Sequence, residues 1–82
     1  MSEPESTHPL HGGVQRKYRF ANGYGASVVK HSYSYGGPEG FWELAVIGLD
    51  GGLCYSTPIT TDVEGWLDET KVDALLSQIE AL

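Results

Sequence analysis

The stretch FWELAVIGL, residues 41–49, decides the fold class of this 82-residue chain, because it is almost wholly apolar. Such a run is typical of a central β-strand that is covered on both faces, or covered on one face and in contact with a partner on the other. It is too short for a membrane-spanning helix, which needs roughly 20 apolar residues. The next residues, DGG (50–52), predict a tight turn. LCYST (53–57) then predicts a returning strand, which Pro58 ends because proline cannot donate to the ladder.

A second hairpin is predicted upstream, around the dipeptide Asn22-Gly23. Aromatic and basic side chains alternate in KYRF (17–20), and this period of two indicates a half-buried strand. Asn-Gly favours a two-residue hairpin, because both residues accept the positive φ of a type I′ turn. A second strand is predicted over residues 24–33, where valine, tyrosine and small residues suit a pleated surface.

The C-terminal segment changes from the strand period to the helix period. Thr61 and Glu64 form the Thr-x-x-Glu pattern of a capping box, and Asp68 predicts a cap for a second helix or a restart. The apolar residues that follow are spaced as in an amphipathic helix: Val72, Leu75, Leu76, Ile79 and Leu82. The predicted fold class is α+β: a four-stranded antiparallel sheet (two hairpins) followed by one or two C-terminal helices packed on one face. Trp42 and Trp66 are expected in the core.

Composition bounds the domain organisation. Residues 1–14 are rich in Ser, Pro, His and Gly, which predicts a disordered tail, and residues 15–82 are predicted to form a single α+β domain. The start of the chain has neither the basic residues nor the apolar segment of a secretion signal. Cys54 is the only cysteine, so no internal disulfide can form, which suits the cytoplasm.

The formal net charge of −6 argues against direct nucleic-acid binding, because proteins that bind the phosphate backbone carry a basic face. Four of the five basic residues lie in the first 30 positions, whereas acidic residues dominate the C-terminal part. This polarity defines a candidate acidic patch: Asp62, Glu64, Asp68, Glu69 and Asp73. A solvated helix face is the simpler interpretation of the same residues.

The glycine-rich stretch YSYGGPEGF, residues 33–41, is interpreted first as a connection between strands. A phosphate-binding loop would need a lysine after the glycines and then a helix. Here no lysine follows, Glu39 would repel phosphate, and the next element is a predicted strand. Tyrosine is enriched in protein interfaces, and loops on a rigid sheet often carry binding residues. The predicted interaction residues are Tyr33, Tyr35, Glu39, Phe41 and Tyr55, and Tyr24 is a further aromatic candidate for the open sheet face.

Residue types with catalytic potential do not form a recognisable set. His8 and His11 lie in the predicted tail without the three or four convergent ligands that zinc requires, so no metal or cofactor is expected. His31 is interpreted as a sheet-surface histidine, and Cys54 as a small buried apolar residue. The sequence therefore favours a protein that is not an enzyme.

Four segments together resemble a group of small proteins encoded by tailed phages of actinobacteria: FANGYGASVV, YSYGGPEGFWELAV, CYSTPITTDVEGWL and VDALLSQIEAL. The likeness covers most of residues 20–82. It implies expression in the cytoplasm of an infected bacterial host cell, but it implies no activity or catalytic residue. In that setting, small acidic proteins often bind host or phage proteins.

Three functional hypotheses follow from these observations. The first is a non-catalytic protein-interaction module, a phage accessory protein that binds a host or phage protein through the sheet face and the 33–41 loop. The second is a self-assembling structural protein, most simply a homodimer that pairs its apolar strands. The third is an acidic mimic of nucleic acid that blocks a DNA-binding enzyme. No membrane association is expected.

Overall fold

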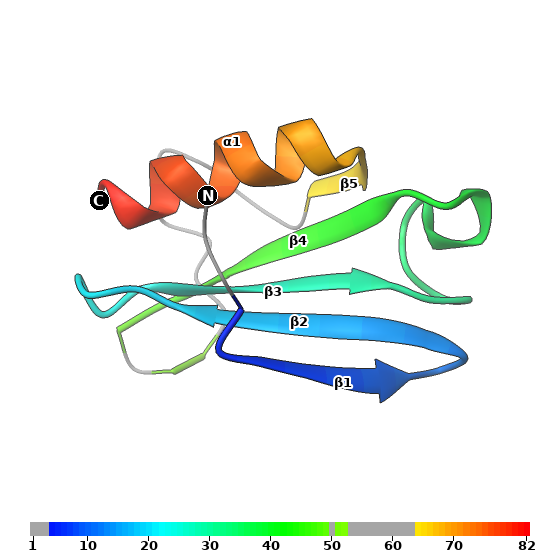
Figure 1. Cartoon of the computed structure of the whole chain (residues 1–82), viewed down its shortest axis with the longest axis horizontal. Helices are drawn as coiled ribbons and strands as arrows, with labels where there is room; N and C mark the ends of the chain where they lie inside the picture. Colours follow the sequence, from blue (N-terminus) through cyan, green and yellow to red (C-terminus); the bar gives the residue numbers. More distant parts are fainter. Residues whose placement is uncertain (1–3, 50, 53–63) are drawn as a thin grey trace.

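The computed structural model describes residues 4–49, 51–52 and 64–82, and these form one antiparallel sheet with one α-helix on a single face (Figure 1). The strands lie in the sheet in chain order, β1-β2-β3-β4-β5. The predicted α+β class is confirmed, but the described sheet has five strands, not four, and one helix follows it. The elements are β1 (Ser6–Leu10), β2 (Gly13–Arg19), β3 (Gly25–Lys30), the short 3₁₀ helix η1 (Gly37–Glu39), β4 (Trp42–Ile47), β5 (Glu64–Leu67) and α1 (Glu69–Glu80).

The predicted hairpin at Asn22-Gly23 joins β2 to β3, but its turn differs from the predicted type I′ turn. Of these two residues only Gly23 has positive φ, at 92°. The Gly23 N–H donates to the Phe20 carbonyl (3.0 Å) and the Phe20 N–H to the Tyr24 carbonyl (2.8 Å), which gives a three-residue loop with one left-handed glycine. The Asn22 side chain is held by other bonds. Its Oδ1 accepts from the Tyr24 N–H (2.9 Å) and its Nδ2 donates to the end of α1.

The predicted disordered tail, residues 1–14, contains an edge strand. β1 pairs with β2 along its whole length. His11 and Gly12 both have positive φ, at 48° and 78°, as in a two-residue type I′ hairpin turn. Pro9 is tolerated because an edge strand needs ladder donors on one side only. The polar, proline-containing composition that predicted disorder is also the composition of a protected edge strand.

The C-terminal prediction is wrong at its start and right afterwards. Residues 64–67 form β5 and not a helix, because Trp66 has a φ of 57°, which a right-handed helix does not contain. Thr61, the other half of the predicted capping box, lies outside the described residues. Asp68 is confirmed as the helix cap, since its Oδ1 accepts a hydrogen bond from the Lys71 N–H (2.8 Å). Part of the predicted 50–52 turn and the whole predicted 53–57 strand also lie outside the described residues.

The core lies between α1 and the sheet face that it covers (Figure 1). Trp42 is buried there as predicted, whereas Trp66 is not. From the helix, the predicted apolar stripe contributes fully buried residues at spacings of three and four, and Leu75 packs at its margin. The buried cluster is Tyr18, Phe20, Ala26, Val28, Trp42, Leu44, Val46, Leu67, Val72, Leu76 and Ile79.

The β2–β3 turn also forms hydrogen bonds to the C-terminal end of α1. The Asn22 Nδ2 donates to the carbonyls of Ile79 (2.9 Å), Glu80 (3.1 Å) and Leu82 (3.1 Å). These carbonyls belong to the last turn of the helix and the residues after it, where few backbone donors remain, although the Ile79 carbonyl also accepts from the Leu82 N–H (3.1 Å). One side chain therefore ties the hairpin to the helix end across the core.

Candidate interaction surface

The connection between β3 and β4, residues 31–41, is an ordered loop. Ser34 is its buried polar anchor. The Ser34 Oγ accepts from the His31 N–H (3.0 Å) and donates to the His31 carbonyl (3.1 Å), and the Ser34 N–H donates to the same carbonyl (3.3 Å). The loop therefore leaves β3 in a tight bend that side-chain and backbone bonds both stabilise.

Gly36 fixes the second half of the loop. Its φ is 86°, and its carbonyl accepts from both the Glu39 N–H (3.1 Å) and the Phe41 N–H (2.9 Å). A Cβ at this position would lie 3.0 Å from the Phe41 Cβ and 3.0 Å from the Trp66 Cα. The left-handed backbone and the lack of space both require glycine here. The loop consequently brings Phe41 and Trp66 close to each other.

Tyr35 connects this loop to the two strands beside it. Its N–H donates to the Glu43 Oε2 (2.7 Å) on β4, and its carbonyl accepts from the Trp66 N–H (3.2 Å) on β5. A Cβ on Gly65 would lie 2.5 Å from the Tyr35 Cβ, so glycine at 65 permits the close approach. The Tyr35 backbone is therefore held in place although its side chain is 63% exposed.

Trp66, which was predicted in the core, lies on the surface. It lies where β5 carries one residue more than β4, a β-bulge between the pairs Trp42–Leu67 and Leu44–Glu64. Its φ of 57° is rare for a bulky residue, and the left-handed position of a bulge is usually glycine. The side chain is 57% exposed, and its ring lies 5.9 Å from the Phe41 ring.

Four aromatic side chains on these segments are exposed, and we call them the aromatic surface. They are Tyr33 (79% exposed), Tyr35 (63%), Trp66 (57%) and Phe41 (38%). This set includes the predicted candidates Tyr33, Tyr35 and Phe41, and Phe41 is the one whose ring lies close to that of Trp66. Glu39 is exposed next to them on η1, Tyr24 is half-buried at the margin of the core, and Tyr55 lies outside the described residues.

Tyr33 belongs to a second group of rings at the same end of the sheet. The His11 ring lies 5.1 Å from the His31 ring and 5.2 Å from the Tyr33 ring, in edge-on contacts. His11 comes from the β1–β2 turn, which lies within the predicted tail, so no local sequence pattern indicates this contact. His31 lies at the end of β3, where its Nδ1 accepts from the Tyr33 N–H (3.0 Å).

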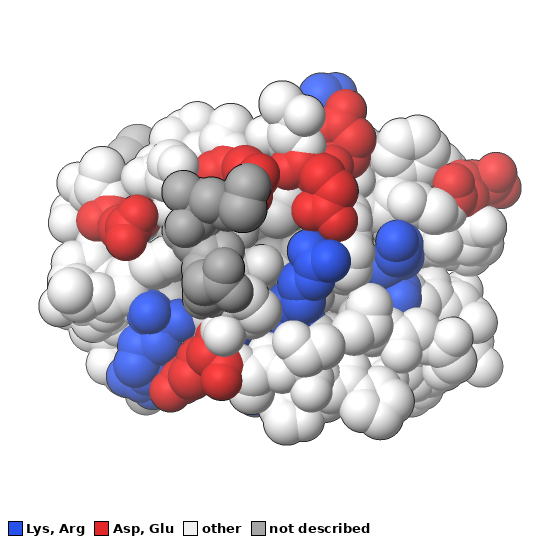
Figure 2. Space-filling view, viewed as in Figure 1, with Lys and Arg blue, Asp and Glu red and all other residues white. Residues whose placement is uncertain are grey.

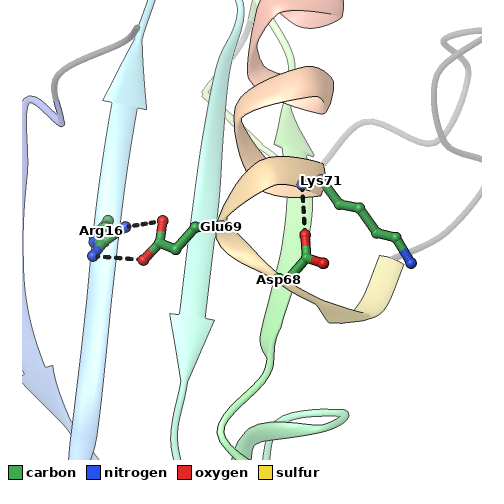
Figure 3. A network of polar contacts seen from close by, with 4 residues as sticks. All are labelled: Arg16, Asp68, Glu69 and Lys71. Carbon is green, nitrogen blue, oxygen red and sulfur yellow. Dashed lines mark hydrogen bonds and ion pairs between the residues drawn. The ribbon is translucent and has the colours of Figure 1, made fainter.

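The residues of the predicted acidic patch differ in their contacts and exposure. Asp68 caps α1, and Glu69 binds Arg16 of β2 through two hydrogen bonds of 3.3 Å (Figure 3). Partial burial lowers the pKa of Arg16, but the hydrogen bond and charge of Glu69, with smaller contributions from Tyr18, raise it above its ordinary value. Of the other predicted patch residues, Glu64 is exposed, Asp73 is half-buried, and Asp62 lies outside the described residues.

The charge polarity of the sequence reappears on the surface. Figure 2 shows most of the visible acidic side chains along the helix and most of the basic ones over the sheet below it. Arg16 and Lys30 both lie over the buried Trp42 ring, at 4.2 Å and 4.5 Å from its centroid. Two cations, Arg16 and Lys30, therefore share one aromatic ring.

Within residues 4–49, 51–52 and 64–82, no group of three or more His, Cys, Asp or Glu side chains could hold a metal ion. The same residues contain no helix with the length and hydrophobicity that a membrane crossing requires. No protein-family model, curated protein or solved structure matches the chain.

Proposed function

We propose that this protein is a small non-catalytic interaction module, and that the aromatic surface binds a protein partner. The observation that supports this most directly is Trp66, a large apolar side chain that is more than half exposed on a strained backbone. Backbone strain of this kind concentrates at functional sites, where the surrounding structure maintains it. Tryptophan and tyrosine are also the residue types that contribute most binding energy at interfaces.

The loop supports the proposal because it is already ordered. Ser34, Gly36 and Glu43 hold its backbone through bonds that leave the aromatic side chains exposed. The loop would therefore lose little conformational entropy when a partner binds, and this favours affinity. The resemblance to proteins of actinobacterial phages adds an expectation about the partner, namely a protein of the phage or of its host.

The experiment compares a surface variant with a matched control. The double variant Tyr35→Ala, Phe41→Ala removes two exposed rings, and Leu49→Ala removes an exposed apolar side chain (68% exposed) beyond the other end of β4. Affinity capture from phage-infected actinobacterial cells should yield one protein with the wild type and with Leu49→Ala, and lose it with the double variant. The captured protein is then purified and titrated calorimetrically. Equal affinity for all three forms would refute the proposed surface.

A second copy of the chain is the alternative occupant. Light scattering over a concentration series decides this before any capture experiment. A dimer that the double variant dissociates would assign the aromatic surface to self-association and overturn the proposal of a different partner. The acidic-mimic hypothesis is weaker because Asp68 and Glu69 already have partners within the fold. It predicts partner binding that falls steeply with salt.

A further inference from the structure

The segments that carry the aromatic surface are acidic and contain no basic residue. Residues 33–43 include Glu39 and Glu43, and residues 64–68 include Glu64 and Asp68. Neither lysine nor arginine occurs anywhere between positions 31 and 70 of the sequence. Glu39 and Glu64 are exposed, and neither forms an ion pair within the residues that the structure describes. Their carboxylates are therefore available to a partner.

These two carboxylates belong to the same segments as the Phe41 and Trp66 rings. The Glu39 N–H and the Phe41 N–H donate to the same Gly36 carbonyl, at 3.1 Å and 2.9 Å. Glu64 lies in β5, two residues before Trp66. Figure 1 shows η1 and β5 at the same end of the molecule. Exposed carboxylates on the segments that hold both rings give this end of the molecule a negative potential.

Trp42 shows how an aromatic ring of this protein is covered where cations are at hand. Arg16 and Lys30 lie over its ring, at 4.2 Å and 4.5 Å from the centroid. In the described part of the chain, no lysine or arginine lies over the ring of Phe41 or Trp66. These two rings, 5.9 Å apart and tilted by 49°, are exposed instead. A cation over them would have to come from another molecule.

We propose that the Phe41–Trp66 ring pair binds an arginine side chain in a basic segment of the protein partner, with Glu39 and Glu64 as the counter-charges. The guanidinium group is the cation that suits this arrangement, because it stacks on aromatic faces and also pairs with carboxylates. The same carboxylates oppose an acidic segment, since like charges across an interface repel each other. The proposal rests on the proposed function and adds to it the chemistry of the partner.

The test is a titration at constant ionic strength with three acetylated and amidated pentapeptides, followed by amide and indole NMR. Their sequences are Gly-Arg-Gly-Arg-Gly, Gly-Lys-Gly-Lys-Gly and Gly-Glu-Gly-Glu-Gly. The chain has two tryptophans, so the exposed Trp66 indole N–H reports on binding and the buried Trp42 indole N–H is an internal reference. The arginine peptide should give saturable shifts at Trp66 and Phe41. It should bind more tightly than the lysine peptide, and the glutamate peptide should give no shifts.

Three matched variants test the counter-charges. Glu39→Gln and Glu64→Gln should each weaken binding of the arginine peptide by about two- to fivefold, the contribution of one exposed ion pair. Glu80→Gln is the control and should leave the affinity unchanged, because Glu80 is an exposed glutamate at the C-terminal end of α1, away from η1 and β5 (Figure 1).

Trp66→Leu tests the ring itself. It keeps an apolar side chain on the same backbone but removes the indole, so the preference for the arginine peptide over the lysine peptide should disappear. The proposal is overturned if the arginine peptide gives no saturable shifts, or if the wild type binds both basic peptides equally. It is also overturned if Glu80→Gln weakens binding as much as Glu39→Gln and Glu64→Gln do.

The purified partner from the capture experiment separates this proposal from the proposed function. If the double variant Glu39→Gln, Glu64→Gln binds that partner with wild-type affinity while Tyr35→Ala, Phe41→Ala does not, the aromatic surface stands and its counter-charges are refuted. If Tyr35→Ala, Phe41→Ala also keeps wild-type affinity, the proposed function fails and this proposal fails with it. A loss in both double variants, with none in Glu80→Gln, supports both.

Discussion

The strained backbone of Trp66 predicts an inversion of the usual order of alanine and glycine. At an ordinary strand position glycine is less stable than alanine by about 0.5–1 kcal/mol, because the unfolded glycine chain has more conformational freedom. At a φ of 57° the alanine Cβ meets the following carbonyl, at a cost of roughly 1–2 kcal/mol. Both Trp66→Ala and Trp66→Gly remove the indole and its contact with Phe41, so the difference between them isolates the backbone term. Trp66→Gly should therefore be more stable than Trp66→Ala by about 0.5–1 kcal/mol.

Urea unfolding measures this difference directly. With a slope of about 1 kcal/mol per molar urea, as for small domains, the midpoint of Trp66→Gly should lie about 0.5–1 M above that of Trp66→Ala. Lys17→Ala and Lys17→Gly provide the control, because Lys17 is exposed in β2 and has no positive φ. There glycine should be the less stable variant. If alanine is at least as stable as glycine at position 66, the left-handed conformation carries no strain and the main support for the proposed site is lost.

Two further predictions concern the helix ends. Asn22→Ala removes the two amide N–H groups that three carbonyls at the end of α1 share, and also the Oδ1 that accepts from the Tyr24 N–H. The free energy of unfolding should therefore fall by about 1–2 kcal/mol in urea denaturation. An unchanged midpoint would contradict the role of Asn22 as the tie between hairpin and helix. Asp68→Ala should lose about 1 kcal/mol as an N-cap deletion, whereas Asp68→Asn should stay within a few tenths of the wild type. A loss of equal size in both variants would point to the charge and not to the cap.

Local rules predicted the parts of the fold that local interactions decide. The period-two alternation and Asn22-Gly23 located the β2–β3 hairpin, the apolar run located β4, and Asp68 located the start of α1. The turn type at Asn22-Gly23 was not predictable from the dipeptide alone. The Asn22 side chain bonds to carbonyls more than 50 residues away along the chain.

The wrong predictions concern segments whose pairing partners are distant in the sequence, or whose composition fits two different structures. β1 is a polar strand with a proline, and only its pairing with β2 distinguishes it from a disordered tail. β5 was predicted as part of a helix, because a capping-box pattern precedes it and its apolar residues also fit a helical face. The conformation of Trp66 depends on Tyr35, whose carbonyl accepts from the Trp66 N–H. That contact joins residues 31 positions apart in the 82-residue chain, and no local pattern encodes it.

Trp66 links the stability of the fold to the proposed function. A glycine at 66 would satisfy the bulge with less strain, as glycine usually does at such positions. Tryptophan there places an exposed indole next to Phe41 and beside the Tyr35 backbone. If Trp66→Gly is the more stable variant and yet loses the partner, the residue is retained for binding at the expense of stability. If Trp66→Gly keeps the partner, the aromatic surface must act through Tyr33, Tyr35 and Phe41 alone, and the strain at 66 requires another explanation.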